Sequence, residues 1–298
     1  MIPYYADERK YIFNTRNPLI KSLVDKRGDQ MVSISGTICG TMIRPDKAWT
    51  PFCEKLFRNF GATRVCLHEI SAAPDSSLSF VNDLPGCKSL AIESGKKVDL
   101  FPLAGNACLE DLQLYPHAQY KPFDLTTLPN LARCQVPLRP EFNSFLKCTK
   151  LVSLCLGGGR HDGVLNLESL RSLEEFICIG VSKLKKVVFH SKARLRSVEF
   201  QDMREFESAE PLEAITRDLR VVELSGVPRM KLEWLKHARK ADCIALRLGE
   251  IPSIRFLAGL KDLRVLDLFG SKVKDGDLSF RDSLKNEIDG KLWSAREP

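Results

Sequence analysis

Apolar residues along the chain follow one phrase, in which leucine or a similar residue fills positions one, four and six. The clearest copies are Leu109-Leu112-Leu114, Leu151-Leu154-Leu156 and Leu263-Leu266-Leu268. The last two apolar positions are separated by one residue, which is the two-residue period of a strand buried on one face. The pattern therefore predicts one strand for each copy of the phrase.

The first positions of the phrase keep a regular spacing through most of the chain. They are Cys87, Leu109, Leu131, Leu151, Leu173, Leu195, Leu219, Cys243 and Leu263. Successive first positions are separated by roughly 20 to 24 residues, a period in the range of leucine-rich repeats. Over roughly residues 62 to 284 the chain thus resembles the leucine-rich repeat family, whose phrase and period these are.

The resemblance implies an α/β solenoid with a concave parallel β-sheet and 3₁₀ or short helices on the convex side. The three-residue spacing of Ile251, Ile254, Leu257 and Leu260 suits such turns. Because the chain shows no secretory signal, membrane helix or effector domain, it is most similar to stand-alone intracellular bacterial members with irregular repeats. Solenoids of this kind offer a long surface that binds another macromolecule.

One extra copy of the phrase breaks the spacing. Leu184-Val187-Phe189 begins midway between the first positions Leu173 and Leu195. A complete coil needs about 20 residues or more, and only half of that separates the extra copy from either neighbour. The sequence leaves open whether a very tight turn or a mispaired phrase lies there.

The ends of the chain lack the repeat. Residues 46 to 60 have apolar residues at helical spacing, with Asp46 as the expected N-cap and Gly61 as the stop. Strands are expected at residues 31 to 35 and around Val65 and Leu67. We therefore divide the chain into an N-terminal cap or arm (1–45), the solenoid (46–284) and a C-terminal cap or tail (285–298).

Composition narrows the setting of the protein. The net charge is +7, and no apolar run reaches the roughly 18 residues that span a bilayer. The ten cysteines form no C-x-x-C pair, and several occupy core positions of the phrase. We expect reduced cysteines, a cytoplasmic location and no membrane partner.

Signs of catalysis are few. The five histidines are scattered, without metal-ligand spacing. The glycine-rich run 157–163 follows a strand, but it lacks the G-K-[ST] ending of a phosphate-binding loop, and we expect it to turn the chain between coils. Fewer than about thirty residues follow the last phrase, too few for a separate catalytic domain. We expect no enzyme, no metal, no cofactor and no small-molecule substrate.

The residues beside the strand leucines are expected to point from the concave face. They form two polar zones, each with one aromatic residue of the kind that anchors interfaces. The first zone is Asp111, Gln113, Tyr115, Arg133 and Gln135. The second zone is Glu199, Glu223, Arg247, Asp267 and Phe269. Between them Cys155, Ile177 and Ile179 are unusually apolar, which indicates either an adhesive contact or a slipped register.

A basic stretch offers an alternative surface. It consists of Lys183, Lys185, Lys186, Lys192, Arg194 and Arg196. Such residues bind nucleic-acid phosphates or an acidic protein, or simply keep a coil soluble. The one aromatic residue among them, Phe189, is an apolar position of the extra phrase, so none is left for stacking on bases, which disfavours nucleic acid as the partner.

The sequence thus favours a non-enzymatic scaffold that binds a partner protein through its concave face. Its most concrete form is an inhibitor or immunity protein for a toxin or another enzyme. The alternatives are an adaptor that tethers two proteins and a nucleic-acid binder that uses residues 183 to 196.

Overall fold

The computed structural model describes residues 20–24, 31–37, 40–46, 49–68, 78–93, 97–277 and 279. It divides into two compact units, Met1–Cys148 and Thr149–Pro298. The division falls inside the stretch predicted as the solenoid. The predicted C-terminal tail, 285–298, lies outside the described residues.

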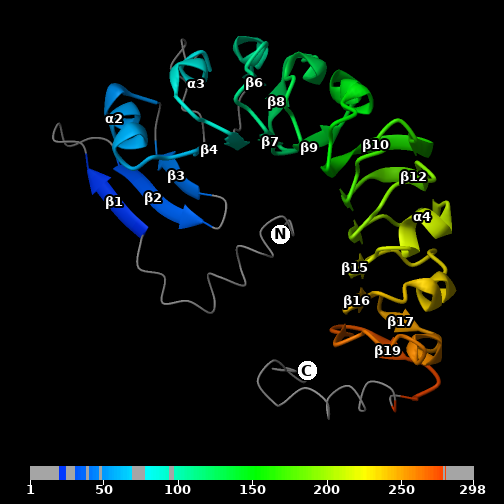
Figure 1. The fold of residues 1–298 in the computed structure, drawn as a ribbon. Helices are drawn as coiled ribbons and strands as arrows, with labels where there is room; N and C mark the ends of the chain where they lie inside the picture. The colour runs from blue at the N-terminus through cyan, green and yellow to red at the C-terminus, as the bar shows by residue number, and fades with distance from the viewer. Residues whose placement is uncertain are drawn as a thin grey trace. The chain divides into compact units, whose positions relative to one another are not determined.

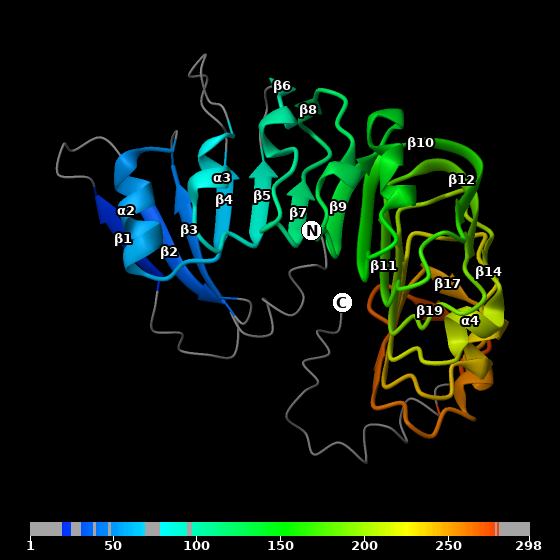
Figure 2. The same ribbon diagram turned by 45° about the horizontal axis from the view of Figure 1, so that its top comes forward.

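The main sheet of the N-terminal unit begins with antiparallel strands and continues with parallel ones. Strand β2 pairs antiparallel with β1 and with β3, and β3 then pairs parallel with β4. From β4 onward every pair is parallel (Figure 2). The strands in sheet order are β1 (Ile20–Val24), β2 (Met31–Thr37), β3 (Gly40–Pro45), β4 (Arg64–His68), β5 (Ser89–Glu93), β7 (Asp111–Leu114) and β9 (Arg133–Leu138).

Short helices and a small strand pair return the chain between these strands. Two of the 3₁₀ helices repeat the predicted spacing of apolar residues, with Leu103 and Leu125 buried. The returning elements are α2 (Pro51–Asn59), α3 (Phe80–Asp83), β6 (Lys97–Val98), η2 (Phe101–Leu103), β8 (Gln119–Tyr120), η3 (Leu125–Thr127) and η4 (Pro140–Lys147). Figure 1 shows α2 and α3 on one side of the sheet.

Helix α2 is shorter than predicted. It starts at Pro51, because Thr50 is the extended N-cap residue and proline suits the first helical position. The expected cap, Asp46, lies well before this start, and Trp49 precedes the helix and stacks on Phe80 at 4.6 Å between ring centroids. The helix ends at Asn59, ahead of Gly61 with its φ of +56°.

The C-terminal unit contains the regular part of the solenoid. Its main sheet has a parallel strand in each coil, in the order β10 (Ser153–Leu167), β11 (Glu175–Ile179), β13 (Ser197–Gln201), β15 (Val221–Ser225), β16 (Cys243–Arg247) and β18 (Val265–Asp267). The returning elements are β12 (Ser182–Phe189), β14 (Ser208–Glu210), α4 (Leu212–Thr216), η5 (Glu233–His237), β17 (Glu250–Ile251), η6 (Arg255–Leu257) and β19 (Lys272–Val273).

Strand β12 explains the extra copy of the phrase. It pairs with the second half of β10 and with β14, and these pairs branch off the path of the main-sheet strands at β10; we call this branch the second sheet. The phrase at Leu184 is therefore the second strand of a single coil, on the side opposite β11 (Figure 2). Phe189 of this strand packs edge-on against Phe176 of β11, at 5.1 Å between centroids. Neither a tight turn nor a mispaired main-sheet phrase is needed.

The glycine-rich run is also part of a strand. Strand β10 passes through it without ending, from the main sheet into the second sheet. Gly158 and Gly159 have φ values of +63° and +89°, a region that only glycine enters freely. These residues bend the strand, whereas the sequence had predicted a sharp turn between coils.

The core of the C-terminal unit lies between the main sheet and the returning elements. Phe200 of β13 stacks on Phe206, with 4.5 Å between the ring centroids, and it also packs against Phe176, with 5.9 Å between the centroids. All three side chains are fully buried. The opposite face of the main sheet is the one predicted to be concave, and in both units we call it the open face.

One repeat was assigned to the wrong register. Cys243 pairs with Val221 and with Val265, so it is the first strand residue and not position one of the phrase. Position one is Ala241, which is completely buried and lies midway along the chain between Leu219 and Leu263. The assignment failed because alanine is too small to stand out as a member of the leucine pattern.

Candidate functional site

Strand pairing places the first predicted zone on the open face of the N-terminal unit. Ser89, Asp111 and Arg133 occupy neighbouring positions on β5, β7 and β9, and Arg64 of β4 precedes them in the same row. Gln113 and Gln135 form the adjacent row. Because side chains in one row of a parallel sheet are spaced by about 4.8 Å, the zone is a continuous set of polar side chains, of which Asp111, Gln113 and Gln135 are buried.

Asp111 is the centre of this zone. Its Oδ2 accepts hydrogen bonds from Ser89 Oγ at 2.9 Å and from Gln113 Nε2 at 3.1 Å. Burial raises the pKa of Asp111 above its ordinary value, opposed by these hydrogen bonds and by the charges of Arg64 and Arg133. The carboxyl group is thus held in place by its neighbours but is poorly hydrated.

Two groups in the zone have unmet hydrogen-bonding capacity. Asp111 Oδ1 and both amide atoms of Gln135 are buried without a hydrogen-bond partner among the described residues. A buried polar atom left without a partner costs about 1 to 3 kcal/mol. A ligand that supplies matching donors and an acceptor would recover this free energy.

The aromatic residue of the first zone, Tyr115, follows β7 directly. It is half-buried, and its carbonyl oxygen accepts a hydrogen bond from Tyr120 Oη at 3.1 Å. Tyr120 also donates to the carbonyl oxygen of Ile92, so one buried hydroxyl ties the ends of two strands together. This fixes the backbone that carries Tyr115.

The second zone lies on the open face of the C-terminal unit and is built around Arg247. Its Nη1 donates to Glu223 Oε1 at 2.5 Å, and its Nη2 donates to Asp267 Oδ2 at 2.7 Å. The guanidinium group thus joins carboxylates from the strands on both sides of its own. Gln201 Nε2 adds a hydrogen bond to the same Glu223 oxygen at 3.2 Å.

The corrected register moves Arg247 within this zone. It aligns with Ser225, whereas Ala245 stands in the row of Glu223 and Asp267 where Arg247 was expected. The alanine leaves room there, and Arg247 reaches back diagonally to both acids. Arg247, Glu223 and Asp267 therefore lie together, although Arg247 stands in a different row from the one expected.

Glu199 stands beside Glu223 on the neighbouring strand. Burial and the nearby Glu223 charge raise the pKa of Glu199 to about 8, although Arg247 opposes the shift. Its Oε1 is buried and has no hydrogen-bond partner among the described residues. Near neutral pH the protonated form of this side chain predominates, so the zone carries less negative charge than its three carboxyl groups suggest.

Phe269 ends the second zone as an exposed aromatic side chain, with 67% of its surface accessible. Its backbone nitrogen donates to Asp267 Oδ1 at 2.8 Å, which connects it to the Arg247 cluster. An exposed ring next to an ordered ion cluster is the arrangement expected of an interface anchor.

The apolar residues between the zones keep their predicted register. Cys155 pairs with Ile177, and Gly157 pairs with Ile179. Since the register does not slip, Ile177 and Cys155 are true members of the open face. Both are nevertheless buried, so they add little exposed apolar surface.

The basic stretch does not form one surface. Lys183, Lys185 and Lys186 belong to β12 in the second sheet, where Lys186 pairs with Glu210 and Lys183 lies 3.5 Å from Glu205. Arg194 and Arg196 lie in the turn that leads into β13 of the main sheet, and Lys192 lies between the two groups. These basic residues are close in the sequence, but they lie on different sides of the same coil.

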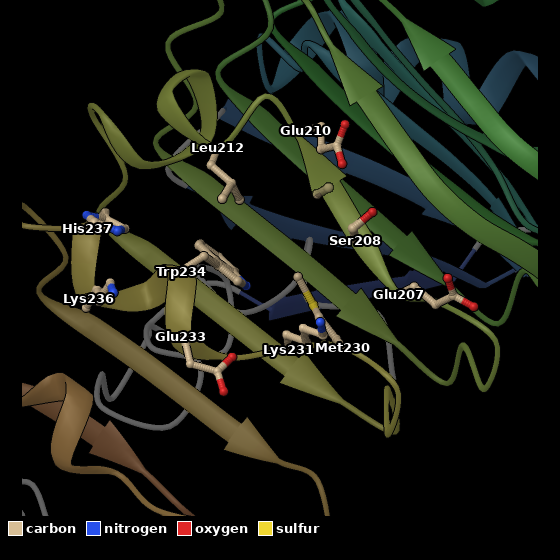
Figure 3. Close-up of a pocket in the computed structure, with 11 residues that line it drawn as sticks. Glu207, Ser208, Glu210, Leu212, Met230, Lys231, Glu233, Trp234, Lys236 and His237 are labelled. Atoms are coloured by element: carbon tan, nitrogen blue, oxygen red, sulfur yellow. The ribbon is translucent and has the colours of Figure 1, made fainter.

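A hollow of about 340 Å³ lies among the returning elements of the C-terminal unit, away from the predicted zones. Leu212, Met230 and Trp234 supply its apolar surface (Figure 3). Glutamates from two coils surround it. Trp234 Nε1 is buried without a hydrogen-bond partner among the described residues. The sequence had not indicated this hollow, because its residues come from two separate coils.

Seven of the described cysteines are buried as small apolar side chains, whereas Cys108 is exposed and Cys243 is partly buried. Burial raises the pKa of Cys87 to about 12 and that of Cys148 to about 11, and it raises the pKa of Cys155 and Cys178 further. Such thiols stay protonated and are poor nucleophiles. Within the described ranges, no three His, Cys, Asp or Glu side chains gather as metal ligands.

No helix in the described part of the chain is long and apolar enough to cross a membrane. The cytoplasmic location stays a prediction from the sequence.

Comparisons with known proteins find distant similarities only. No family model and no curated protein matches the chain. An internalin structure from Listeria monocytogenes is 16% identical, with 78% of this chain and 80% of that chain covered and a TM-score of 0.41. The functional domain of InlJ from the same organism, which includes a cysteine ladder, is 14% identical, with 78% and 63% covered and a TM-score of 0.31. What the repeated phrase and the strand pairing establish together is an α/β solenoid of the leucine-rich repeat kind.

Proposed function

We propose that the protein is a non-enzymatic scaffold that binds a partner protein through the open face of its main sheet. The observation that carries the proposal is the pair of ordered polar zones on this face, around Asp111 and around Arg247. Each is held by side chains from several strands and is bordered by an aromatic residue, Tyr115 or Phe269. Pre-ordered polar groups beside aromatic anchors lower the entropy cost of association.

The first zone indicates what the partner contributes. Asp111 Oδ1 and the Gln135 amide have acceptor and donor capacity that nothing among the described residues satisfies. A partner surface with an amide group or a basic side chain would satisfy them once the groups that cover them move aside, because Asp111 and Gln135 are buried. We expect the hot spot of the interface at this position, because restoring buried hydrogen bonds is worth more than exposed contacts.

The finer form of the proposal is inhibition of a toxin or another enzyme. The open face of a multi-stranded sheet can bury the roughly 800 Å² that each partner contributes to a stable complex. That area suffices to cover an active site. This form rests on the family resemblance, because no residue in either zone is specific to a toxin.

Affinity purification from the native lysate tests the proposal. The wild-type chain is compared with Tyr115→Ala and Phe269→Ala, at moderate and high salt and after nuclease treatment. One dominant protein retained after nuclease and lost with the two variants would support open-face binding. Recovery of nucleic acid alone would contradict it.

A matched control keeps the test specific. Phe101 on η2 is 76% exposed and lies among the returning elements, so Phe101→Ala removes a ring at least as exposed as Phe269 from another surface. The same partner should remain bound to this variant. Loss with Phe101→Ala alone would place the interface on the returning elements.

A second candidate is an adaptor that tethers two proteins. The observation in its favour is the hollow around Trp234, which lies among returning elements and not on the open face. An adaptor would give two partners that bind at once, of which Trp234→Ala removes only one.

A further inference from the structure

The turns that lead into the main-sheet strands of the C-terminal unit form a continuous strip, which we call the entry strip. It comprises residues 149–152, 171–174, 193–196, 217–220, 239–242 and 261–264. Backbone hydrogen bonds join one turn to the next, as from Arg196 N to Glu174 O at 2.7 Å and from Arg220 N to Arg196 O at 2.8 Å. Because every coil contributes the same four positions, their side chains repeat along one edge of the sheet.

The entry strip carries most of the net charge of the protein. It contains ten basic and four acidic residues, a net charge of +6, whereas the whole chain has +7. The ten basic side chains are all exposed. They are Lys150, Arg171, Arg194, Arg196, Arg217, Arg220, Arg239, Lys240, Lys261 and Arg264.

The same turns in the N-terminal unit show no such charge. At residues 85–88, 107–110 and 129–132 the charged side chains are Lys88 and Glu110 alone. These two form an ion pair with each other at 2.9 Å. The positive charge is therefore not a general property of the turn and is specific to the C-terminal unit.

The middle of the entry strip is a polar hollow of about 380 Å³, lined by Arg194, Arg196, Arg220 and Asp218. Asp218 is already paired with Lys240, at 2.5 Å between Nζ and Oδ1. Arg194 forms no ion pair within the described residues, and Arg220 uses one nitrogen on the carbonyl oxygen of Lys240. Arg196 is paired with Glu174, at 3.3 Å between Nε and Oε2, so Arg194 and Arg220 hold most of the capacity for an added anion.

We propose that the entry strip is a second contact surface, which recognises a carboxylate-rich segment of the partner protein. Seven of the ten basic residues are arginine, whose planar group binds carboxylates in a bidentate manner. The strip also has no aromatic side chain on which a base could stack. This inference rests on the proposed protein-binding function and adds the chemical character of the partner, which is a segment rich in carboxylates.

The test uses a labelled polyglutamate peptide, long enough to span several turns of the strip, with fluorescence anisotropy at 50 and 300 mM NaCl. The wild type is compared with Arg194→Glu/Arg196→Glu/Arg220→Glu. The control, Lys185→Glu/Arg204→Glu/Arg229→Glu, changes the net charge equally at exposed sites outside the strip. We expect the strip variant to bind at least tenfold more weakly and the control within about twofold of the wild type. The higher salt should weaken binding, since exposed charges are screened.

Three results would overturn the proposal. These are no binding of polyglutamate at 50 mM NaCl, equal losses in the two triple variants, and tighter binding of a DNA duplex of equal charge that the strip variant abolishes. If the strip variant is unfolded by circular dichroism, the Gln triple at the same positions replaces it. The open-face variants Tyr115→Ala and Phe269→Ala should still bind polyglutamate. A wrong proposal for the entry strip and a wrong proposal for open-face binding therefore give different results.

Discussion

Arg247 and Glu223 are joined by a hydrogen bond of 2.5 Å although they do not face each other in the sheet. Arg247 pairs with Ser225, two positions further along β15, and reaches back across the position of Ala245. Its other nitrogens bind Asp267 on the far side. One side chain thus ties together three successive coils, in the zone assigned to partner binding.

Removal of this arginine should destabilise the C-terminal unit. In Arg247→Ala the half-buried carboxylates of Glu223 and Asp267 lose their cation, and Glu223 still stands beside Glu199. We expect a loss of about 1 to 2 kcal/mol in the free energy of unfolding, between the values for exposed and buried pairs. Urea denaturation of the wild type and the variant measures it.

Arg255 provides the matched control. It also contacts two aspartates, Asp275 and Asp277, but its own side chain is 70% exposed. Water screens such pairs, so Arg255→Ala should change stability much less. Equal losses for the two variants would show that the Arg247 cluster has no special role.

The raised pKa of Glu199 predicts a pH dependence. The folded-state pKa is about 8, above the ordinary glutamate value of 4.5. The folded state therefore holds a proton that the unfolded state loses, and stability should fall as pH rises from about 4.5 to 8. Glu199→Gln mimics the protonated form, so its stability relative to the wild type should increase over this window by several kcal/mol, at about 1.4 kcal/mol for each pKa unit.

Urea denaturation of both proteins at pH 5 and pH 8.5 isolates the contribution of Glu199. All other ionisable groups are present in the wild type and in the variant, so their effects cancel in the difference. The difference between variant and wild type should be small at pH 5 and clearly positive at pH 8.5. A difference that does not change with pH would show that Glu199 titrates like an ordinary carboxyl group.

The stacked phenylalanines predict a large cavity effect. Phe200 is fully buried and contacts both Phe176 and Phe206. Phe200→Ala should cost about 3 to 5 kcal/mol, the range for deleting a buried aromatic ring. Thermal unfolding measures the loss, and Phe101→Ala, at an exposed site, should leave the midpoint nearly unchanged.

Gly226 tests the packing of the turns that follow the strands. Its φ is +62°, and a Cβ atom there would lie 2.7 Å from Asp202 Oδ1 and 3.2 Å from Asp202 Cα. Gly226→Ala should therefore cost about 2 to 3 kcal/mol. Gly249→Ala, with φ of +78° and open space around the added carbon, should cost about 1 kcal/mol. Equal costs would show that Asp202 moves aside freely.

Much of the main sheet could be predicted from the sequence, because its residues repeat at a fixed interval. The period placed Asp111, Gln113 and Gln135 on one face, and strand pairing confirms their register. The period failed at Ala241, where a small residue fills a leucine position. Because of this error, Arg247 was expected two residues away from its actual position along the strand. Ala241 could be identified only from the pairing of β16 with its neighbouring strands, and the sequence of one repeat does not show that pairing.

The second sheet could not be predicted, for a physical reason. Strand β12 uses the same alternation of apolar residues as a main-sheet strand, since both bury one face against the same core. Alternation tells that a strand is present but not which sheet it joins. The entry strip was missed for a related reason, because Arg194 and Arg220 belong to different repeats and become neighbours only when the coils stack.

Photo-crosslinking tests open-face binding most directly. A photoreactive phenylalanine analogue replaces Tyr115, Phe269 or Phe101 in turn, and each protein is irradiated in the native lysate. Both open-face positions should give adducts with the same protein, and Phe101 on the returning elements should give none. Adducts from Phe101 alone, or none from Tyr115 and Phe269 while the partner is bound, would contradict binding through the open face.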